Sequence, residues 1–421
     1  MGEAGSQTGI YRGWHAVAIG FAIFFFAYAG SSTLPLVYAP VIAEFGWTRV
    51  QATMIYAYAS GASALMAIFM IGPLVARFGL KPVQAVSLVI LGLGMASFLF
   101  IRGPLTYYLA GLLLGVGQGT VMVLIMVLVS RWFTRNVGLA CAITVAGTSL
   151  GGTIFPLYAA WALQALGWRA TMGSLGIGVF LIALPLCLIA KTDPSPEDLL
   201  REAAPQARDT LSAEIMRSAE PDLTLAQVRR HSAFWVSAAG IVLTAIVDQA
   251  LFQHTVLFLT EQVGLSTKIA ATAVSVTFVV GLVAKFVAGR FFDWLSIRGI
   301  AAWYALLALS TLSAFTVHGV ASAMLFALGR GIVHGGLVTE SGVLAKHVFG
   351  PRHVDRVLPV YAGSFAVGSS IGPVALSMIV DRTGSYSLGF LLLTGLSLAA
   401  AVLIFGVRPI YRNRLRAISG L

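Results

Sequence analysis

Long apolar stretches separated by short polar segments run along almost the whole chain. Many of them are long enough to cross about 30 Å of hydrocarbon as a helix. We therefore predict an all-α membrane protein with twelve transmembrane helices. Their expected ranges are 16–44, 50–74, 83–101, 104–129, 137–163, 169–190, 233–259, 267–290, 299–317, 321–345, 357–380 and 388–407.

The chain also repeats itself at a shift of about 217 residues. Each match is weak alone, but several at one offset indicate that a half-length unit was duplicated. The matching segments are residues 44–48 and 261–266, 72–77 and 289–294, 155–156 and 372–373, and 167–169 and 384–386. This predicts two pseudo-symmetric six-helix bundles, residues 1–190 and 233–421. In so apolar a chain, a doubled unit indicates a transporter whose bundles rock about a site between them.

One long polar stretch, residues 191–232, holds half of the 16 acidic residues. Residues 195–198 combine a capping serine, a proline and two acids, which is typical of a helix start. Residues 224–227 have capping-box spacing. We expect a cytoplasmic linker with one or two surface helices, and a basic cytoplasmic tail at the end of the second bundle.

The net charge of +11 indicates orientation rather than a nucleic-acid partner, because most of the 27 Lys and Arg residues fall on one side. Those expected outside the cell are Arg49, Arg102, Arg169, Lys268 and Arg382. This positive-inside asymmetry predicts a multi-pass protein of the cytoplasmic membrane with both termini in the cytoplasm. Both cysteines lie in predicted helices, and we expect no signal peptide and no disulfide.

Two loop motifs carry a family resemblance. Residues 72–81 resemble the signature between helices 2 and 3 of the major facilitator superfamily, with Ala76 at the usual aspartate and Arg77 as the basic residue. In the second copy, residues 289–298, the acid is kept as Asp293 and Ser296 replaces a glycine. The resemblance implies the fold of that superfamily, and we include Arg77 and Asp293 as candidate gating residues.

Two further loops narrow the resemblance to one branch. Residues 131–140 resemble the loop that enters helix 5 in the monocarboxylate and oxalate–formate branch, and residues 349–356 resemble its counterpart before helix 11. The branch implies a small organic anion as substrate. Drug exporters of the same superfamily carry a Gly-Pro signature in helix 5, but Gly152 stands where their proline would be.

Charged side chains inside the predicted helices are the main site candidates. Each costs at least about 2.5 kcal/mol near mid-bilayer, so it must face a partner, water or the bundle interior. The four residues are Asp248, Lys285, Arg330 and Glu340. Lys285 is the first candidate for substrate contact, because the resemblance implies a substrate-binding cation, commonly arginine, at this point of helix 8. The alternative is an ion pair between Lys285 and Asp248 that joins helices 7 and 8.

The remaining intramembrane groups are candidates for a second contact or for coupling. His254 matches a histidine-containing run in helix 7 of these relatives, and it would bind the substrate carboxylate, carry a proton, or bond a neighbouring helix. Arg330 is a candidate second anion site, and Glu340 a candidate gate. The family often places an acid four residues before the helix 8 cation, where this chain has Gly281. A proton-coupling role would therefore pass to Asp248, His254 or Glu340, or be absent.

Uncharged polar side chains on several other helices complete the candidate cavity. We select Tyr28, Gln118 and Tyr361 as substrate-binding candidates from a larger set that also includes Ser31, Ser32, Tyr56, Thr144, Thr148 and Ser364. Hydroxyl groups in membrane helices often bond their own backbone.

Together these features predict a secondary transporter that moves a small monocarboxylate or dicarboxylate by alternating access, as a monomer in the lipid bilayer. Lys285 would either exchange a proton as the anion binds, which gives symport, or stay charged, which gives anion exchange. The alternatives are a drug or siderophore exporter and a transporter-like carboxylate sensor. We expect no enzyme activity, cofactor or metal, because the sequence contains no cofactor loop, nucleophile elbow or metal-ligand cluster.

Overall fold

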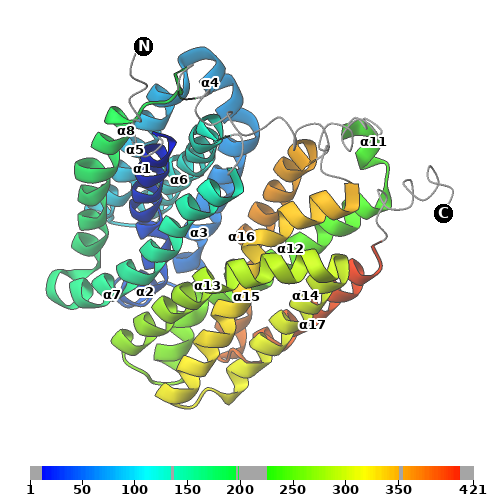
Figure 1. Ribbon diagram of the computed structural model, residues 1–421. Coiled ribbons are helices and arrows are strands. Elements are labelled where there is room, and N and C mark those ends of the chain that lie inside the picture. Colours follow the sequence, from blue (N-terminus) through cyan, green and yellow to red (C-terminus); the bar gives the residue numbers. More distant parts are fainter. Residues whose placement is uncertain (1–11, 134–136, 196–197, 199–224, 350–353, 408–421) are drawn as a thin grey trace, which may run out of the picture.

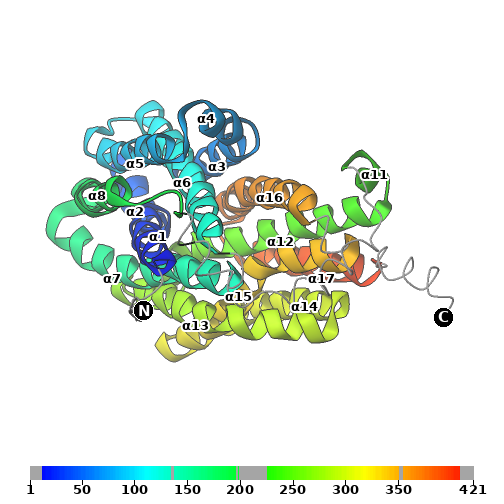
Figure 2. The same ribbon diagram turned by 45° about the horizontal axis from the view of Figure 1, so that its top comes forward.

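The computed structural model describes residues 12–133, 137–195, 198, 225–349 and 354–407, and all regular structure in these ranges is helical. Figures 1 and 2 show the helices in two groups, α1 to α8 and α12 to α17, which we call the N-terminal and C-terminal bundles. The basic tail, most of the linker and parts of both branch motifs (134–136 and 350–353) lie outside the described residues. The predicted all-α fold is confirmed.

The N-terminal bundle contains the helical segments that precede the linker. They are α1 (Gly13–Ala27), α2 (Ala29–Phe45), α3 (Arg49–Leu65), α4 (Ile71–Phe78), α5 (Leu80–Ala96), α6 (Pro104–Trp132), α7 (Val137–Gly178) and α8 (Leu184–Ile189). Short π-helical segments join α3 to α4 and α7 to α8. The first span runs without interruption from Gly13 to Phe45; α1 and α2 meet at Tyr28, which keeps helical φ and ψ and bonds to Phe24 and Ser32 as in a helix.

The C-terminal bundle follows α11 (Leu225–Arg229), a single turn at the end of the linker. Its helices are α12 (Ser232–Leu257), α13 (Thr267–Leu295), α14 (Ile297–Leu312), α15 (Val320–Phe349), α16 (Val354–Thr383) and α17 (Ser387–Phe405). A π-helical segment, Phe258–Gln262, extends α12.

Among the described residues, 11 helical stretches are long and apolar enough to cross a membrane. One of them, Val137–Ile189, is 53 residues long and bends back at Gly167, whose φ of +76° is outside the helical region. Glycine tolerates this conformation because it has no Cβ. The bend divides the stretch into two spans, so the chain crosses twelve times, and each predicted range overlaps one observed span.

Local side-chain bonds begin several of these helices. The Thr48 hydroxyl accepts from the Gln51 N–H while the Gln51 side chain accepts from the Thr48 N–H, which is a complete capping box for α3. In the linker, Ser195 N–H and Oγ–H donate to Asp198, at 3.1 and 2.7 Å. These bonds hold the pKa of the Asp198 carboxyl below its usual value. Ser195 Oγ also accepts from the Asp198 N–H at 3.3 Å, as a capping serine does, but the helix predicted to follow lies outside the described residues.

The backbone repeats with the sequence. The described residues with positive φ form three pairs at shifts of about 217 residues: Gly46 with Gly264, Gly79 with Ser296, and Gly167 with Gly384. Close helix contacts repeat too. A Cβ added at Gly151 would lie 2.5 Å from the Phe25 carbonyl oxygen, and one at Gly368 would lie 2.4 Å from that of Val242. Both members of the second contact follow the first by the same shift.

Successive spans reverse direction, so the loops gather at two faces. The terminal face holds the described chain ends, Arg12 and Val407, and the Arg49 face holds the opposite loops, including the start of α3. The two bundles meet along α3 with α16, α7 with α13, and α2 with α12. We call this surface the seam, and the charged and polar residues that line it form the candidate site.

Candidate functional site

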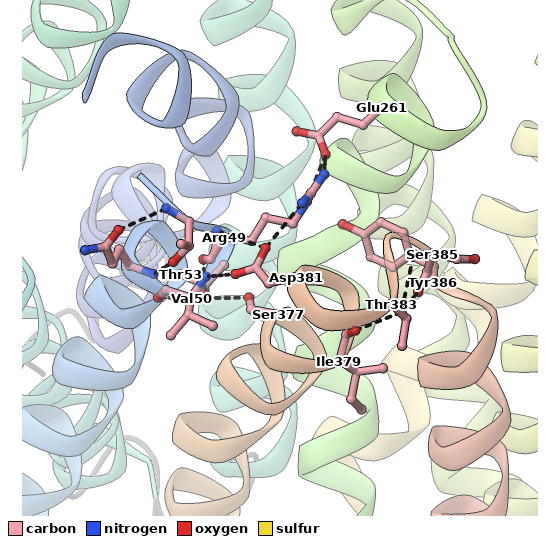
Figure 3. Close-up of polar contacts among 12 residues, drawn as sticks. Arg49, Val50, Thr53, Glu261, Ser377, Ile379, Asp381, Thr383, Ser385 and Tyr386 are labelled. Carbon is pink, nitrogen blue, oxygen red and sulfur yellow. Dashed lines mark hydrogen bonds and ion pairs between the residues drawn. The ribbon is translucent and has the colours of Figure 1, made fainter. Parts of the chain in front are cut away.

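Arg49 joins the two bundles at the Arg49 face. Its Nη2 lies 2.6 Å from Oε2 of Glu261, and its Nη1 lies 3.2 Å from Oδ1 of Asp381. The Asp381 carboxylate also accepts from the backbone N–H groups of Arg49 and Val50, at 3.3 and 3.1 Å. These N–H groups begin α3 and have no partner within their own helix. Figure 3 shows Asp381 between the guanidinium and the start of α3.

Three further hydrogen bonds continue this contact towards the centre of the protein. Thr53 and Tyr56 follow Arg49 by four and seven residues, which places all three on one face of α3. The bonded pairs are Thr53 with Ser377 (2.8 Å), Tyr56 with Gln249 (2.7 Å) and Tyr38 with Gln253 (2.6 Å). The bundles are therefore held together from the Arg49 face to about mid-membrane.

Lys285 lies deeper, where α13 contacts α7. It is 18 residues into α13, about 27 Å from the end at the Arg49 face. Its Nζ donates to Ser149 Oγ across the seam at 2.8 Å, which is its one polar partner among the described residues. The side chain is half-buried. No described acidic group pairs with this ammonium, so the alternative of a Lys285–Asp248 ion pair is wrong.

Aromatic rings cover the seam one to two turns from Lys285. Phe278 lies two turns before it on the same face of α13. A Cβ added at Gly152 would lie 2.5 Å from the Phe278 ring, and the Tyr28 ring lies 5.6 Å from it, edge to face. Tyr28 is half-buried where α1 meets α2. This predicted candidate therefore contacts the wall that also carries Lys285.

Asp248 is bound inside the C-terminal bundle by two basic residues of α15. Arg330 Nη2 lies 2.6 Å from its Oδ1, and His334 Nδ1 lies 3.0 Å from its Oδ2. The Gln249 amide donates to the same Oδ2 at 2.9 Å. The Asp248 and Arg330 side chains are 1% and 3% exposed, so the pair is shielded from water. The charge of Arg330, predicted as a second anion site, is thus already matched by Asp248.

His334 was not among the sequence-predicted site residues. Its ring lies beside Phe278, with centroids 5.6 Å apart, and beside Phe252 at 6.4 Å. A Cβ added at Gly281 would lie 3.8 Å from His334 Cδ2. The signal that could have found it is its spacing of four residues from Arg330, which puts both side chains on one face of α15.

Two other predicted candidates, His254 and Gln118, form hydrogen bonds within their own bundles. His254 is 1% exposed, and its ring nitrogens contact the Tyr386 hydroxyl and the Pro373 carbonyl, both at 3.0 Å. That is the arrangement of a histidine bonded to neighbouring helices. The Gln118 side chain accepts a hydrogen bond from Ser31.

Four candidates lie away from the described part of the seam that holds Lys285. Tyr361 is fully buried, with its ring 6.0 Å from that of Phe234. Glu340 is 1% exposed and accepts from Thr244 Oγ1 at 3.4 Å. Among the described residues it has no basic partner, and the loop 350–353 that follows the same helix lies outside them, so the gating role stays a prediction.

Asp293 and Arg77 lie near the terminal face, each within its own bundle. The Asp293 carboxylate is 66% exposed and lies 3.9 Å from His347 Nε2. The Arg77 guanidinium lies over the Phe78 ring at 5.2 Å and has no acidic partner among the described residues. Nor do three His, Cys, Asp or Glu side chains within the described ranges converge as a metal site would require.

Known proteins resemble this chain over most of its length. A family model described as Major Facilitator Superfamily matches residues 19–335. Monocarboxylate transporter 12 of Rattus norvegicus is 23% identical over 335 residues, covering 74% of this chain and 67% of that protein. Monocarboxylate transporter 10 of Danio rerio is 21% identical over 314 residues, covering 72% of this chain and 58% of that protein.

Solved structures share the fold at lower identity. A bacterial homolog to the human lysosomal transporter Spinster, in an inward-facing and occupied conformation, has a TM-score of 0.69 and 16% identity, covering 97% of this chain and 98% of that chain. The nucleoside transporter NupG has a TM-score of 0.72 and 14% identity, covering 93% and 99%. The family match, the twelve spans and the two repeated bundles agree: this chain belongs to the Major Facilitator Superfamily and is similar to its monocarboxylate transporters.

Proposed function

We propose that this protein carries a small organic carboxylate across the cytoplasmic membrane by alternating access, with Lys285 as the cation that binds the carboxylate. The observation that carries the proposal is the position of Lys285 Nζ in the seam with one neutral partner, Ser149 Oγ, at 2.8 Å. The similarity to monocarboxylate transporters 12 and 10 supports the substrate class.

A buried charge is costly unless it is paired, and a neutral hydroxyl matches only part of the charge of an ammonium. A carboxylate that reached Nζ would form a charge-assisted hydrogen bond, which is stronger than the bond to Ser149. By contrast, Arg330 already has its carboxylate in Asp248. Lys285 is therefore the charge in the described seam that gains most from an anion.

The contacts across the seam support a gate at one face. All hydrogen bonds and ion pairs between described residues of the two bundles lie at Lys285 or on its Arg49 side. Such contacts would hold the Arg49 side of the seam closed in this conformation. Rocking of the bundles would break the Arg49 contacts and admit substrate from that side.

The direction of the protein in the membrane follows from its Lys and Arg residues, most of which belong to the terminal face. We propose that this face is cytoplasmic and that the Arg49 face is outside. In a cysteine-free background, a cysteine at Gly103 in the loop before α6 should react with a membrane-impermeant maleimide on intact cells. A cysteine at Thr192 should react only after lysis, and the reverse pattern would show that the orientation is wrong.

Transport by purified protein in liposomes tests the role of Lys285. We expect Lys285→Ala to lower uptake of radiolabelled lactate or oxalate by about 10- to 100-fold, because a hydrogen bond to a charged group contributes about 1.5 to 3 kcal/mol. Lys285→Arg should keep part of the activity, since it keeps the charge.

The matched control is Lys268→Ala, which removes an exposed lysine from the first turn of the same helix. It should transport like the wild type. Uptake by Lys285→Ala at the wild-type rate would show that the carboxylate does not bind there. If the wild type moves neither probe while it stays folded, the carboxylate class itself is wrong.

A further inference from the structure

We propose that His334 is the proton-binding residue of this transporter, oriented by Asp248 and coupled to a carboxylate held by Lys285; the coupling rests on the function proposed above. The two nitrogens of its ring have different surroundings. Nδ1 lies 3.0 Å from Asp248 Oδ2. Nε2 has no hydrogen-bond partner among the described residues, and the side chain is 9% exposed.

His334 places a titratable side chain next to a position of α13 that holds only a glycine, Gly281. Related transporters often carry an acid four residues before the cation of helix 8, and here that position is Gly281. The His334 ring lies over this glycine, because a Cβ there would be 3.8 Å from His334 Cδ2. A titratable group from α15 therefore occupies the space beside Gly281, one turn of α13 from Lys285.

The hydrogen bond to Asp248 fixes the tautomer and the orientation of the His334 ring. A carboxylate that accepts from Nδ1–H holds one tautomer and leaves Nε2 as the basic nitrogen. The Phe252 ring stacks on the imidazole with centroids 6.4 Å apart, and the Phe278 ring meets it edge to face at 5.6 Å. With Nδ1 bonded to Asp248, Nε2 is directed away from that carboxylate. A hydronium ion then transfers a proton to Nε2: an O–H bond breaks, the Nε2–H bond of an imidazolium forms, and a water molecule is left.

The local charge balance links this proton to the anion. His334 contacts Asp248 of α12, which Arg330 of α15 also binds, and its ring lies over Gly281, one turn of α13 before Lys285. Asp248 and Arg330 neutralise each other, so an imidazolium would add a second positive charge about one turn of α13 from Lys285. Like charges disfavour that state, and a bound carboxylate relieves it. The proton and the anion therefore bind cooperatively, and one of each would cross together.

The Phe278 ring also connects His334 to the seam between the two bundles. Phe278 contacts both Tyr28 and the backbone at Gly152 across the seam. When the bundles rock, these N-terminal contacts must change while Asp248 and His334 move as one unit of the C-terminal bundle. The change in the seam would then expose Nε2 to the other side of the membrane, where the proton and the carboxylate leave.

The experiment separates coupling from binding in proteoliposomes. His334→Asn keeps an N–H donor near the Nδ1 position for Asp248 but cannot carry a proton. Against the wild type we expect counterflow of radiolabelled lactate or oxalate to change less than about 3-fold. Accumulation driven by a pH gradient should fall at least about 10-fold, within the usual range of coupling factors. Acidification of the lumen on addition of the anion should fall with it.

His318→Asn is the matched control, because His318 is exposed at the Arg49 face and should leave all three readouts unchanged. Gradient-driven accumulation by His334→Asn at the wild-type level would overturn the proposal and leave the imidazole as a mere donor to Asp248.

A second measurement keeps the proposal testable if His334→Asn fails to fold or if neither probe is transported. The resonance of His334 in 15N-histidine-labelled protein in nanodiscs is identified by its loss in a His334→Gln variant. We expect it to change with pH and to shift on addition of oxalate. A signal that does not titrate would show that His334 binds no proton. A signal that titrates without carboxylate flux would overturn the substrate assignment and the coupling, but not the proton site.

Discussion

At the residue scale, the buried pair of Asp248 and Arg330 determines which substitutions at these two positions destabilise the C-terminal bundle. Their side chains are almost completely shielded, and the charged atoms are 2.6 Å apart. Taking two ions out of water costs several kcal/mol each, and their attraction and hydrogen bonds only offset that cost. Removing one partner leaves an uncompensated charge, whereas removing both leaves none.

We therefore expect Asp248→Leu and Arg330→Met each to lower the stability of the protein by about 3 to 5 kcal/mol, and the double variant to recover most of the loss. Thermal unfolding in detergent, followed by tryptophan fluorescence, measures this. The exposed pair of Arg131 and Asp193 is the control, since its single variants should cost at most about 1 kcal/mol. Additive losses in the double variant would show that the two charges do not compensate each other.

The sequence marked the charged side chains inside the spans as site candidates, because such residues are rare in lipid. It did not predict which residues they would contact. Asp248 is 37 residues from Lys285 and 82 from Arg330. The partner is decided by the direction in which each helix turns its side chain, and sequence distance carries no information about that. Ser149, the partner of Lys285, is a hydroxyl residue like many others in these helices, so nothing in the sequence marked it.

At the element scale, the apolar pattern predicted the spans well because length and hydropathy are properties of the sequence itself. Gly167 also marked the turn between two spans that run on as one helical stretch. The first span, predicted as 16–44, is one stretch from Gly13 to Phe45, and helical hydrogen bonds run through Tyr28.

The repeat is more exact in the structure than in the sequence. Gly151 and Gly368 let carbonyl groups of the first and seventh spans approach at equivalent points. Ser296, by contrast, keeps a φ of +54° at the position where the first repeat has Gly79. Its hydroxyl lies 2.9 Å from His347 Nδ1, a bond that glycine could not make and that helps to offset the backbone strain. The backbone was thus conserved where the side chain diverged.

At the scale of the whole molecule, the seam is strong enough to hold one conformation and weak enough to open. Arg49 and Glu261 are each 30% exposed, so their pair contributes at most about 1 kcal/mol. Each hydrogen bond deeper in the seam contributes about 1 kcal/mol in net terms. The sum is a few kcal/mol. A free-energy difference of this size between two conformations can be reversed by substrate binding. A covalent bond in the same place would remove that balance.

The pair of Thr53 and Ser377 offers the site for such a bond, because their hydroxyl oxygens lie 2.8 Å apart across the seam. Cysteines at both positions are close enough to form a disulfide of about 2.05 Å. In a background of Cys141→Ser and Cys187→Ser, the oxidised double variant should lose nearly all liposome uptake and regain it on reduction. Each single cysteine should transport in both conditions. If the oxidised protein transports at its reduced rate, α3 and α16 do not separate during the cycle, and the bundles cannot rock about Lys285 as proposed.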